Sequence, residues 1–442
     1  MADPTAAFAE LVALVAAAEP ERLLPSRYGG SPVGGPLALC AATQIRPGLW
    51  LAVVRSPNAG LIAAPLIIDE GSSVRRAVPG DEAATALLDV LSRGELADDP
   101  EGFIVTSLVQ DARSSGTERP MQVDQTHESV VVGDRQVVKW AVAAEPTPAP
   151  TLVAHLAAAG FTDMAAPTGF VTWRDGDQDV LVASAVGFLA GASDGWTWAV
   201  GDAGDYATGA SDLEPSSAAL TDVGRLVADL HVCLATPTAV LAVPRSSATA
   251  EDCKAWAELA RSLLEQVLDE VDGAAGERLG QRAEAIDEVF SAFEHMGATP
   301  MIPVHGDLHV GQVLRWTGGY AVGDFDGNPV LPVSARLAPQ PAARDVAGML
   351  QSIDHVGRVV DRRVAGADPT KVQRWIAEAQ ATFLAAYEQR LARRQMTDLL
   401  DRRLLMPFQV EQECREFLYA VRHLPRWRYV PDQALQALID VD

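Results

Sequence analysis

The sequence VHGDLHVGQVL occupies residues 304–314, and YAVGDFDGNP follows at residues 320–329. Short apolar runs alternate here with Gly, Pro and Asp, so the helical periodicity of the surrounding chain is interrupted. Segments of this kind form loops, and loops held by a rigid scaffold often carry binding and catalytic residues. We therefore expect a functional site at these two stretches.

Three side chains in these stretches, Asp307, Gln312 and Asp324, suit phosphoryl transfer from a nucleotide. This chemistry needs a carboxylate that orients the acceptor hydroxyl and groups that hold Mg²⁺ against the phosphates. In protein kinases an amide ligand follows the catalytic Asp by five positions, and a further Asp comes later in the chain. Asp307 and Gln312 have this spacing, and Asp324 ends an apolar, strand-like run. Any one of them alone is more simply a cap or turn residue; their joint spacing favours a kinase.

With these motifs the chain resembles the aminoglycoside phosphotransferases of kinase-like fold and, more closely, the actinobacterial maltokinases. The resemblance extends over most of the chain and implies that Asp307 is the catalytic base and that Gln312 and Asp324 bind Mg²⁺. For His309 a substrate contact and a structural role both stay open, and Arg344 with Asp345 is expected as a buried pair that supports the catalytic loop. Further matching segments are Val74-Arg75-Arg76-Ala77, Asp194-Gly195-Trp196, Gly224-Arg225-Leu226 with Leu230-His231, Arg344-Asp345-Val346-Ala347-Gly348-Met349-Leu350, and Trp427 with Pro431.

The C-terminal segment departs from the maltokinase pattern. Residues 411–419, EQECREFLY, and 424–427, LPRW, are similar instead to the glucosamine kinases related to maltokinases. A helix over 408–419 places Gln409, Glu413 and Glu416 on one face, with Tyr419 on the adjacent stripe. Such a face is usually solvated, but carboxylates suit an ammonium sugar better than a neutral one because charge-assisted hydrogen bonds are stronger. We therefore expect these four residues to bind glucosamine; Trp427 either stacks on the sugar or packs the last helix.

Upstream, the strand-like run that contains Lys139 is a candidate for binding the nucleotide. Lys139 is one of only three lysines, and it follows a hairpin in which Thr126, His127 and Ser129 would help the backbone amides cover the phosphates of ATP. The simpler alternative is an exposed lysine on an edge strand. In kinases a Glu on the next helix pairs with this lysine, but the helix expected from Thr151 carries no acidic residue.

The order of apolar patterns predicts an α+β chain with a bilobal protein-kinase-like fold, an additional N-terminal α+β cap domain and a mainly helical C-terminal lobe. The cap is expected at 1–90, with strands near 37–45, 49–55 and 61–68. A sheet-based, nucleotide-binding lobe is expected at 91–188, where Val180–Gly187 would meet adenine. The helical lobe, with the catalytic loop and the sugar site, is expected at 189–442.

Composition and charge exclude other classes of function. The 442 residues include 35 Lys and Arg against 59 Asp and Glu, and the net charge of −24 argues against nucleic acid or an anionic membrane surface as a partner. Four scattered cysteines form neither a zinc ribbon nor a disulfide framework. No signal peptide or apolar run of 18 residues is found, so a cytoplasmic location is expected.

Three hypotheses remain from the sequence. The first is an ATP-dependent kinase that phosphorylates the 6-hydroxyl of glucosamine, with ATP and Mg²⁺ as cofactors and an amino sugar as the acceptor. The second is a kinase for maltose, glucose or an aminoglycoside that uses the same base and metal ligands. The third is an inactive pseudokinase that serves as a binding module, which the missing Glu partner of Lys139 suggests and the intact Asp307, Gln312 and Asp324 oppose.

Overall fold

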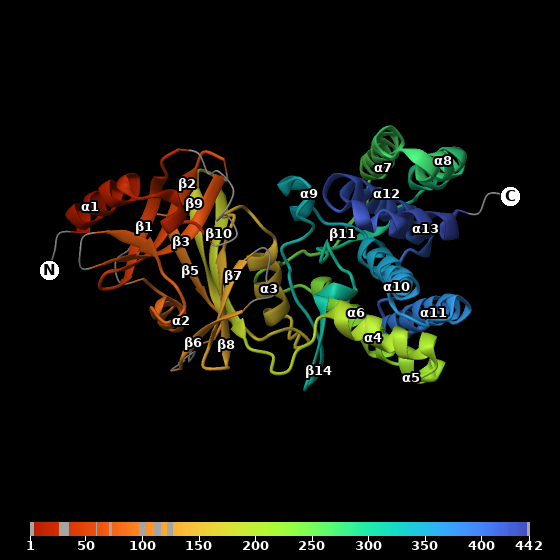
Figure 1. The fold of residues 1–442 in the computed structure, drawn as a ribbon, viewed down its shortest axis with the longest axis horizontal. Coiled ribbons are helices and arrows are strands. Elements are labelled where there is room, and N and C mark those ends of the chain that lie inside the picture. Colours follow the sequence, from red (N-terminus) through yellow and green to blue (C-terminus); the bar gives the residue numbers. More distant parts are fainter. Residues whose placement is uncertain are drawn as a thin grey trace. The chain divides into compact units, whose positions relative to one another are not determined.

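The computed structural model describes residues 4–25, 35–58, 60–69, 73–96, 102–109, 116–121 and 127–439. The chain divides into two compact units, Met1–Pro150 with Ala165–Ala190 and Thr151–Met164 with Gly191–Asp442. The first unit contains both large sheets, and the second is mainly helical (Figure 1). This arrangement agrees with the expected α+β class. Among the described residues, no helix combines the length and the apolar character needed to cross a bilayer.

The first unit is built on two antiparallel sheets, one of four strands in the order β1-β2-β3-β4 and one of six in the order β5-β9-β10-β8-β7-β6. The strands are β1 (Ala38–Arg46), β2 (Leu49–Ser56), β3 (Gly60–Ile68), β4 (Val74–Arg76), β5 (Phe103–Ser107), β6 (Glu118–Met121), β7 (His127–Val132), β8 (Gln136–Ala141), β9 (Pro167–Asp175) and β10 (Gln178–Gly187). The helices of this unit are α1 (Pro4–Ala17), the short 3₁₀ turn η1 (Pro20–Arg22) and α2 (Ala83–Arg93).

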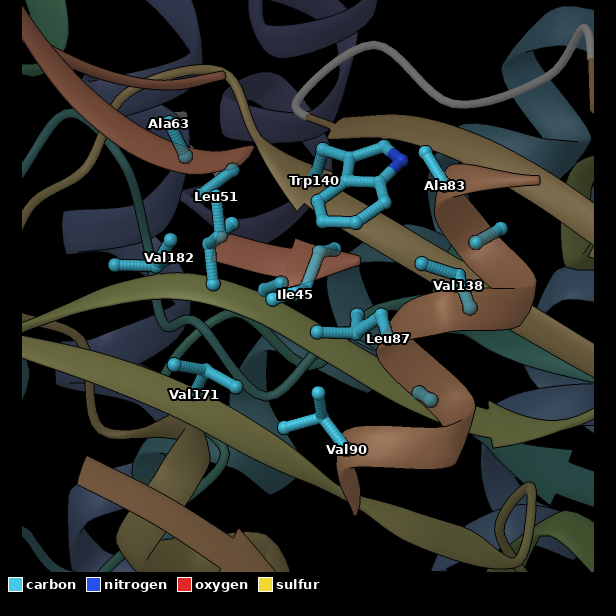
Figure 2. Packing of buried hydrophobic residues seen from close by; sticks show 14 of the residues in the cluster. Ile45, Leu51, Ala63, Ala83, Leu87, Val90, Val138, Trp140, Val171 and Val182 are labelled. Carbon is cyan, nitrogen blue, oxygen red and sulfur yellow. The ribbon is translucent and has the colours of Figure 1, made fainter. Parts of the chain in front are cut away.

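One hydrophobic core joins the two sheets through α2. Leu87 and Val90 of this helix pack in the same cluster as Leu51 of β2 and Val138 of β8 (Figure 2). A separate cluster lies under α1, on the other face of the four-stranded sheet. The cap expected at 1–90 and the sheet-based lobe expected at 91–188 therefore share buried side chains, and their boundary at residue 90 stays a prediction.

The second unit is assembled from helices and two short antiparallel two-stranded sheets. Its helices are α3 (Ala149–Ala158), which starts at the unit boundary, α4 (Gly195–Thr208), α5 (Leu213–Ser217), α6 (Ala219–Leu234), α7 (Ala250–Glu270), α8 (Gly273–Glu294), α9 (Val333–Leu337), α10 (Ala343–Arg363), α11 (Pro369–Arg393), α12 (Leu405–His423) and α13 (Tyr429–Leu438). The 3₁₀ turns are η3 (Val310–Gln312), η4 (Thr397–Leu399), η5 (Arg402–Leu404) and η6 (Pro425–Trp427). One sheet pairs β11 (Ser246–Ser247) with β12 (Pro300–Met301), which α7 and α8 separate in the chain; the other is the hairpin of β13 (Val313–Trp316) and β14 (Gly319–Val322).

Helix α10 is the central element of the second unit. It packs against α4, α11, α12 and α13 (Figure 1). Every residue from Asp345 to Val360 except Gly348 is buried. Gly348 lies where a Cβ atom would come within 2.8 Å of the Leu308 carbonyl oxygen, so a glycine lets the catalytic loop approach the helix backbone. A helix buried on all sides can present polar groups only where they find partners. The buried polar residues of α10 therefore indicate where this helix makes specific polar contacts.

Candidate functional site

The loop that begins at His305 is held by Asp345, in the first turn of α10. The carboxylate of Asp345 accepts hydrogen bonds from the backbone N–H groups of His305 (2.8 Å) and Gly306 (2.9 Å). The ring of His305 in turn contacts the carbonyl oxygen of Gly323, at 2.9 Å from Nε2, so the two sequence stretches are tied together. Asp345 thus fixes the backbone immediately before Asp307.

The expected pairing of Arg344 with Asp345 is wrong. Arg344 donates to Glu411 on α12 at 3.0 Å, and its guanidinium lies over the ring of Phe408. Consecutive residues of a helix point about 100° apart, so these two side chains face different neighbours. The partner of Asp345 is His231 on α6, at 3.2 Å, and the other ring nitrogen of His231 lies 2.7 Å from the hydroxyl of Tyr387.

Asp307 has an environment that suits a base. Asn328 donates a hydrogen bond of 2.9 Å to one of its carboxylate oxygens. Burial raises the pKa of Asp307 to about 6; the interaction with His305 opposes this shift, and the negative charge of Asp324 adds to it. The group is therefore ionised at neutral pH but more basic than an ordinary aspartate. Asn328, which bonds Asp307, comes four residues after Asp324, so the stretch that contains Asp324 meets the loop that carries Asp307.

Gln312 and Asp324 form the second part of the site. The amide nitrogen of Gln312 lies 3.3 Å from one carboxylate oxygen of Asp324, so the end of η3 contacts the second residue after β14. Asp324 has a φ of +63°, an uncommon conformation for a residue with a side chain that is often found at functional sites. An amide oxygen and a carboxylate are ligands that Mg²⁺ accepts. The donor set therefore fits a magnesium ion.

Helix α4 brings an aromatic residue to the loop. A Cβ atom on Gly195 would lie 1.6 Å from the carbonyl oxygen of Val310, so only glycine permits this approach. The next residue, Trp196, has its ring 6.4 Å from that of His309. His309 accepts the N–H of Gly311 at 3.0 Å, and burial lowers its pKa to about 4, so the ring is neutral. This bond gives His309 a structural role, and a substrate contact stays a prediction.

The helix expected over 408–419 is α12, and its predicted face points in part toward α10. Glu413 is completely buried and accepts from Gln351 at 2.6 Å, and the ring of His355 lies 2.7 Å from the same oxygen. Gln409 donates to Gln351 at 2.7 Å. Glu416 is only partly buried, and burial together with the charge of Asp307 raises its pKa.

The structure therefore separates the four predicted sugar ligands. Glu416 is partly exposed as a residue, and the charge of Asp307 contributes to its raised pKa. Gln409 and Glu413 belong to the contact between α10 and α12. Tyr419 is 45% exposed, with its ring against His423 of the same helix. The binding roles of all four stay predictions.

Trp427, in η6, lies among other rings of the second unit. It makes edge contacts with Trp196 (6.0 Å between centroids), His355 (6.4 Å) and Tyr429 (6.2 Å), and the guanidinium of Arg363 lies over its ring. Its ring thus packs locally while the residue remains partly exposed. A chain of rings links His309 to His355 through Trp196 and Trp427, along one side of the loop that carries Asp307.

The predicted nucleotide ligands lie in the first unit. Lys139 of β8 is directly opposite Ser129 of β7 and Ser184 of β10, so these three residues share one face of the sheet. The neighbours Val138 and Trp140 point into the shared core, so Lys139 points away from it. His127 is the first residue of β7, and Thr126 lies outside the described residues. Helix α3 contains no acidic residue.

Several supporting residues had no role assigned from the sequence. Asn328, His231 and Trp196 stand in the motifs quoted above, but their partners are distant in sequence and become visible only in the fold. Ser352, whose hydroxyl accepts the N–H of Val310 at 2.9 Å, is a further example. His231 and Ser352 are polar residues within otherwise apolar helical stripes, and this pattern could have indicated that each has a buried hydrogen-bond partner.

Comparisons with known proteins identify the family of the chain. No protein-family model matches the chain. The chain is 46% identical over 433 residues to a glucosamine kinase of Streptacidiphilus jiangxiensis, covering 96% of this chain and 97% of that relative. It is 41% identical over 398 residues to a glucosamine kinase of Mycolicibacterium smegmatis, covering 89% and 96%.

Solved structures show the same similarity. A glucosamine kinase in one crystal form matches with a TM-score of 0.85 at 44% identity, over 97% of this chain and 99% of that chain. A glucosamine kinase in complex with glucosamine, ADP and inorganic phosphate matches with a TM-score of 0.83 at 44% identity, with the same coverage. The chain belongs to the glucosamine kinase family.

Proposed function

We propose that this protein is an ATP-dependent kinase that phosphorylates glucosamine on its 6-hydroxyl and releases glucosamine 6-phosphate and ADP. The observation that carries the proposal is the match, over 97% of the chain, to a glucosamine kinase that holds glucosamine, ADP and inorganic phosphate. The geometry around Asp307 supports the same reaction. A kinase for maltose, glucose or an aminoglycoside, and an inactive binding module, are the alternatives that an assay must separate.

Asp307 is proposed as the general base. The 6-oxygen of the sugar attacks the γ-phosphorus, the bond from that phosphorus to the bridging oxygen of ADP breaks, and the hydroxyl proton passes to the Asp307 carboxylate. A base with a pKa of about 6 accepts this proton more readily than an ordinary aspartate does, while it stays ionised at neutral pH. Asn328, which donates to one carboxylate oxygen, leaves the other available for the hydroxyl.

Gln312 and Asp324 are proposed to hold Mg²⁺, which would neutralise charge on the phosphates. Their contact places both side chains at one point beside the Asp307 loop. Lys139 is proposed to bind the α and β phosphates, and Ser129, His127 and Thr126 are proposed to help cover them. The position of Lys139 on the sheet face away from the core supports this assignment.

The acceptor is proposed to lie beside Asp307 and Glu416, with the sugar amine near the Glu416 carboxylate. The charge of Asp307 contributes to the raised pKa of Glu416, which supports a site in which Asp307 contacts the hydroxyl and Glu416 contacts the amine. Trp427 and Trp196 would bound the sugar on the side of the ring chain. The cytoplasm is proposed as the location of the reaction.

A substrate panel tests the proposal. ADP release with ATP and Mg²⁺ is measured with glucosamine, N-acetylglucosamine, glucose, maltose and an aminoglycoside. The highest kcat/KM is expected with glucosamine, and a preference for maltose or no turnover on any acceptor would refute it. In a parallel test, Asp307→Ala should abolish turnover but keep nucleotide binding, because the carboxylate orients the acceptor and does not hold ATP.

A further inference from the structure

The proposed magnesium ligands lie at the open end of the hairpin formed by β13 and β14. Gln312 comes immediately before β13, and Asp324 is the second residue after β14. The N–H of Gly323 donates to the carbonyl oxygen of Gln312 at 3.0 Å, so the two strand ends stay paired up to the ligands. Gln312 is partly exposed and Asp324 is exposed. The separation of these accessible side chains therefore depends on how the hairpin is held.

The outer edge of β13 is bonded to the residues at the start of α4. In an antiparallel pair, every second residue directs its N–H and C=O groups away from the partner strand. Arg315 does so, and it exchanges both backbone hydrogen bonds with Ser193, at 2.8 and 3.0 Å. Val313 does so as well, and its carbonyl oxygen accepts the indole N–H of Trp198 at 2.9 Å. The Trp198 side chain thus completes the edge of β13 beside Gln312.

The ring of Trp198 also packs against side chains of the hairpin. Trp198 is 4% exposed, and the guanidinium of Arg315 lies 4.7 Å from its ring centroid. Tyr320, the cross-strand partner of Arg315, makes an edge contact with the same ring at 5.5 Å. Arg315 also forms an ion pair with Asp202, which lies one turn after Trp198 on α4. The middle of the hairpin is therefore packed against α4.

The outer edge of β14 is bonded as well. The N–H of Val322 donates to the carbonyl oxygen of Asp163 at 2.9 Å, and Val322 forms a parallel bridge with Met164. A two-stranded hairpin is marginally stable on its own, so its geometry comes from contacts with the rest of the fold. In this hairpin those contacts run along both edges, and the contact nearest to Gln312 on the β13 edge is the indole N–H of Trp198.

We propose that Trp198 is a positioning residue for magnesium, which holds the start of β13 so that Gln312 and Asp324 keep the separation that one ion requires. This inference rests on the proposed function, because the two ligands are themselves proposed. Mg²⁺ demands a near-ideal octahedral geometry, so a small displacement of one ligand weakens its binding. Partners outside the ligand set typically change metal affinity by about 10- to 100-fold. Trp198 acts through the backbone of Val313 and does not contact the ion.

The test compares Trp198→Phe with Trp375→Phe. The first change removes the N–H that Val313 accepts and keeps an aromatic ring. Trp375 on α11 is the matched control, because it is also buried and its indole N–H donates to a backbone carbonyl, that of Ser216 in α5, at 3.2 Å. Mn²⁺ replaces Mg²⁺ as the probe, since it accepts the same oxygen ligands. The measured quantity is the dissociation constant of Mn²⁺ for the enzyme with bound ADP, from the electron paramagnetic resonance of the free ion.

The effect should be specific to the metal. Trp198→Phe should weaken Mn²⁺ binding by about tenfold, whereas Trp375→Phe should change it by less than about twofold. ADP affinity without metal and KM for glucosamine should be unchanged in both variants. The kcat of Trp198→Phe should be low at limiting Mg²⁺ and return to the wild-type value at saturating Mg²⁺. A purely structural role would lower the stability of both variants and leave Mn²⁺ affinity unaltered.

Wild-type Mn²⁺ affinity in Trp198→Phe, or an equal loss in Trp375→Phe, overturns the inference. If Trp198→Phe does not fold, Asp202→Asn decides, because it weakens the ion pair that ties Arg315 to α4. A roughly threefold loss of Mn²⁺ affinity then supports the inference, and wild-type affinity overturns it. If the wild-type enzyme with ADP binds no Mn²⁺, or if Asp324→Asn binds it equally well, the metal site of the proposed function is wrong instead, so the two failures are told apart.

Discussion

Replacing Asp345 by Asn tests whether this one carboxylate positions the catalytic loop. One oxygen accepts from His305 and contacts His231, and the other accepts from Gly306. Asparagine has nearly the same shape but only one acceptor oxygen, so one backbone N–H must face its NH₂ group. Losing one hydrogen bond to a charged group and leaving a buried donor unpaired costs about 3 kcal/mol in the free energy of unfolding.

The effect on turnover should exceed the effect on stability. Asp307 lies one residue after Gly306, and misplacing a catalytic group by about 1 Å can cost roughly 100-fold in rate. We expect kcat to fall about 100-fold while the dissociation constant for ADP changes little. The measurements are chemical denaturation, ADP release at saturating substrates, and ADP binding.

Asp229→Asn is the matched control. Asp229 is a largely buried acid on α6, two residues before His231, and it pairs with Arg390 and Arg394. This change should lower stability but leave kcat unaltered. The reasoning fails if Asp345→Asn has wild-type kcat per folded molecule, or if both variants lose the same fraction of kcat.

Further predictions concern the base, the sugar site and the nucleotide site. Because the folded-state pKa of Asp307 is raised from 3.8 to about 6, its ionisation lowers stability as pH rises through that range. At pH 7, Asp307→Asn should therefore raise the free energy of unfolding by up to about 3 kcal/mol, and with it the Tm, while turnover is lost. An unchanged Tm would contradict this. For the same reason, wild-type kcat/KM should decline below about pH 6, as a pH–rate profile would reveal. Glu416→Gln should raise KM for glucosamine more than for glucose, and equal effects would show that this acid does not read the amine. Lys139→Met should raise KM for ATP at least tenfold, whereas the exposed Lys254→Met should not; similar KM values would argue against a phosphate contact.

The elements with a clear periodicity were predictable from the sequence. The first three strands, expected at 37–45, 49–55 and 61–68, are observed at Ala38–Arg46, Leu49–Ser56 and Gly60–Ile68. Apolar runs separated by turn residues fix such boundaries locally. Helix α12 was expected over 408–419 for the same kind of reason and spans Leu405–His423.

Other elements depend on contacts that a single segment does not reveal. Strand β9 begins with Pro167 and contains Gly169, and it is stabilised by pairing with β5 on one side and β10 on the other. Strand β6 has the sequence ERPM, which lacks a strand pattern and lies at the edge of the sheet. Neighbouring strands, more than intrinsic preference, determine such segments.

The same distinction applies to the site. Asp307, Gln312 and Asp324 could be chosen as candidates because their spacing lies within two short stretches. The partner of Asp345 was not, because His231 is 114 positions away and no local pattern connects the two. The burial of Glu413 against His355 also escaped the sequence, since a helical face does not show which neighbouring helix will cover it.

Helix α10 contacts both the loop that carries Asp307 and helix α12. Asp345 in its first turn holds the backbone beside the base, and His355 lies ten residues further along, about 15 Å at the rise of an α-helix. Because α10 is buried along most of its length, it fixes the distance between the loop that carries Asp307 and the part of α12 that carries Glu413. A one-residue insertion between these positions would turn every later side chain by about 100°. His355 would then turn away from Glu413, and the polar contact between α10 and α12 would be lost.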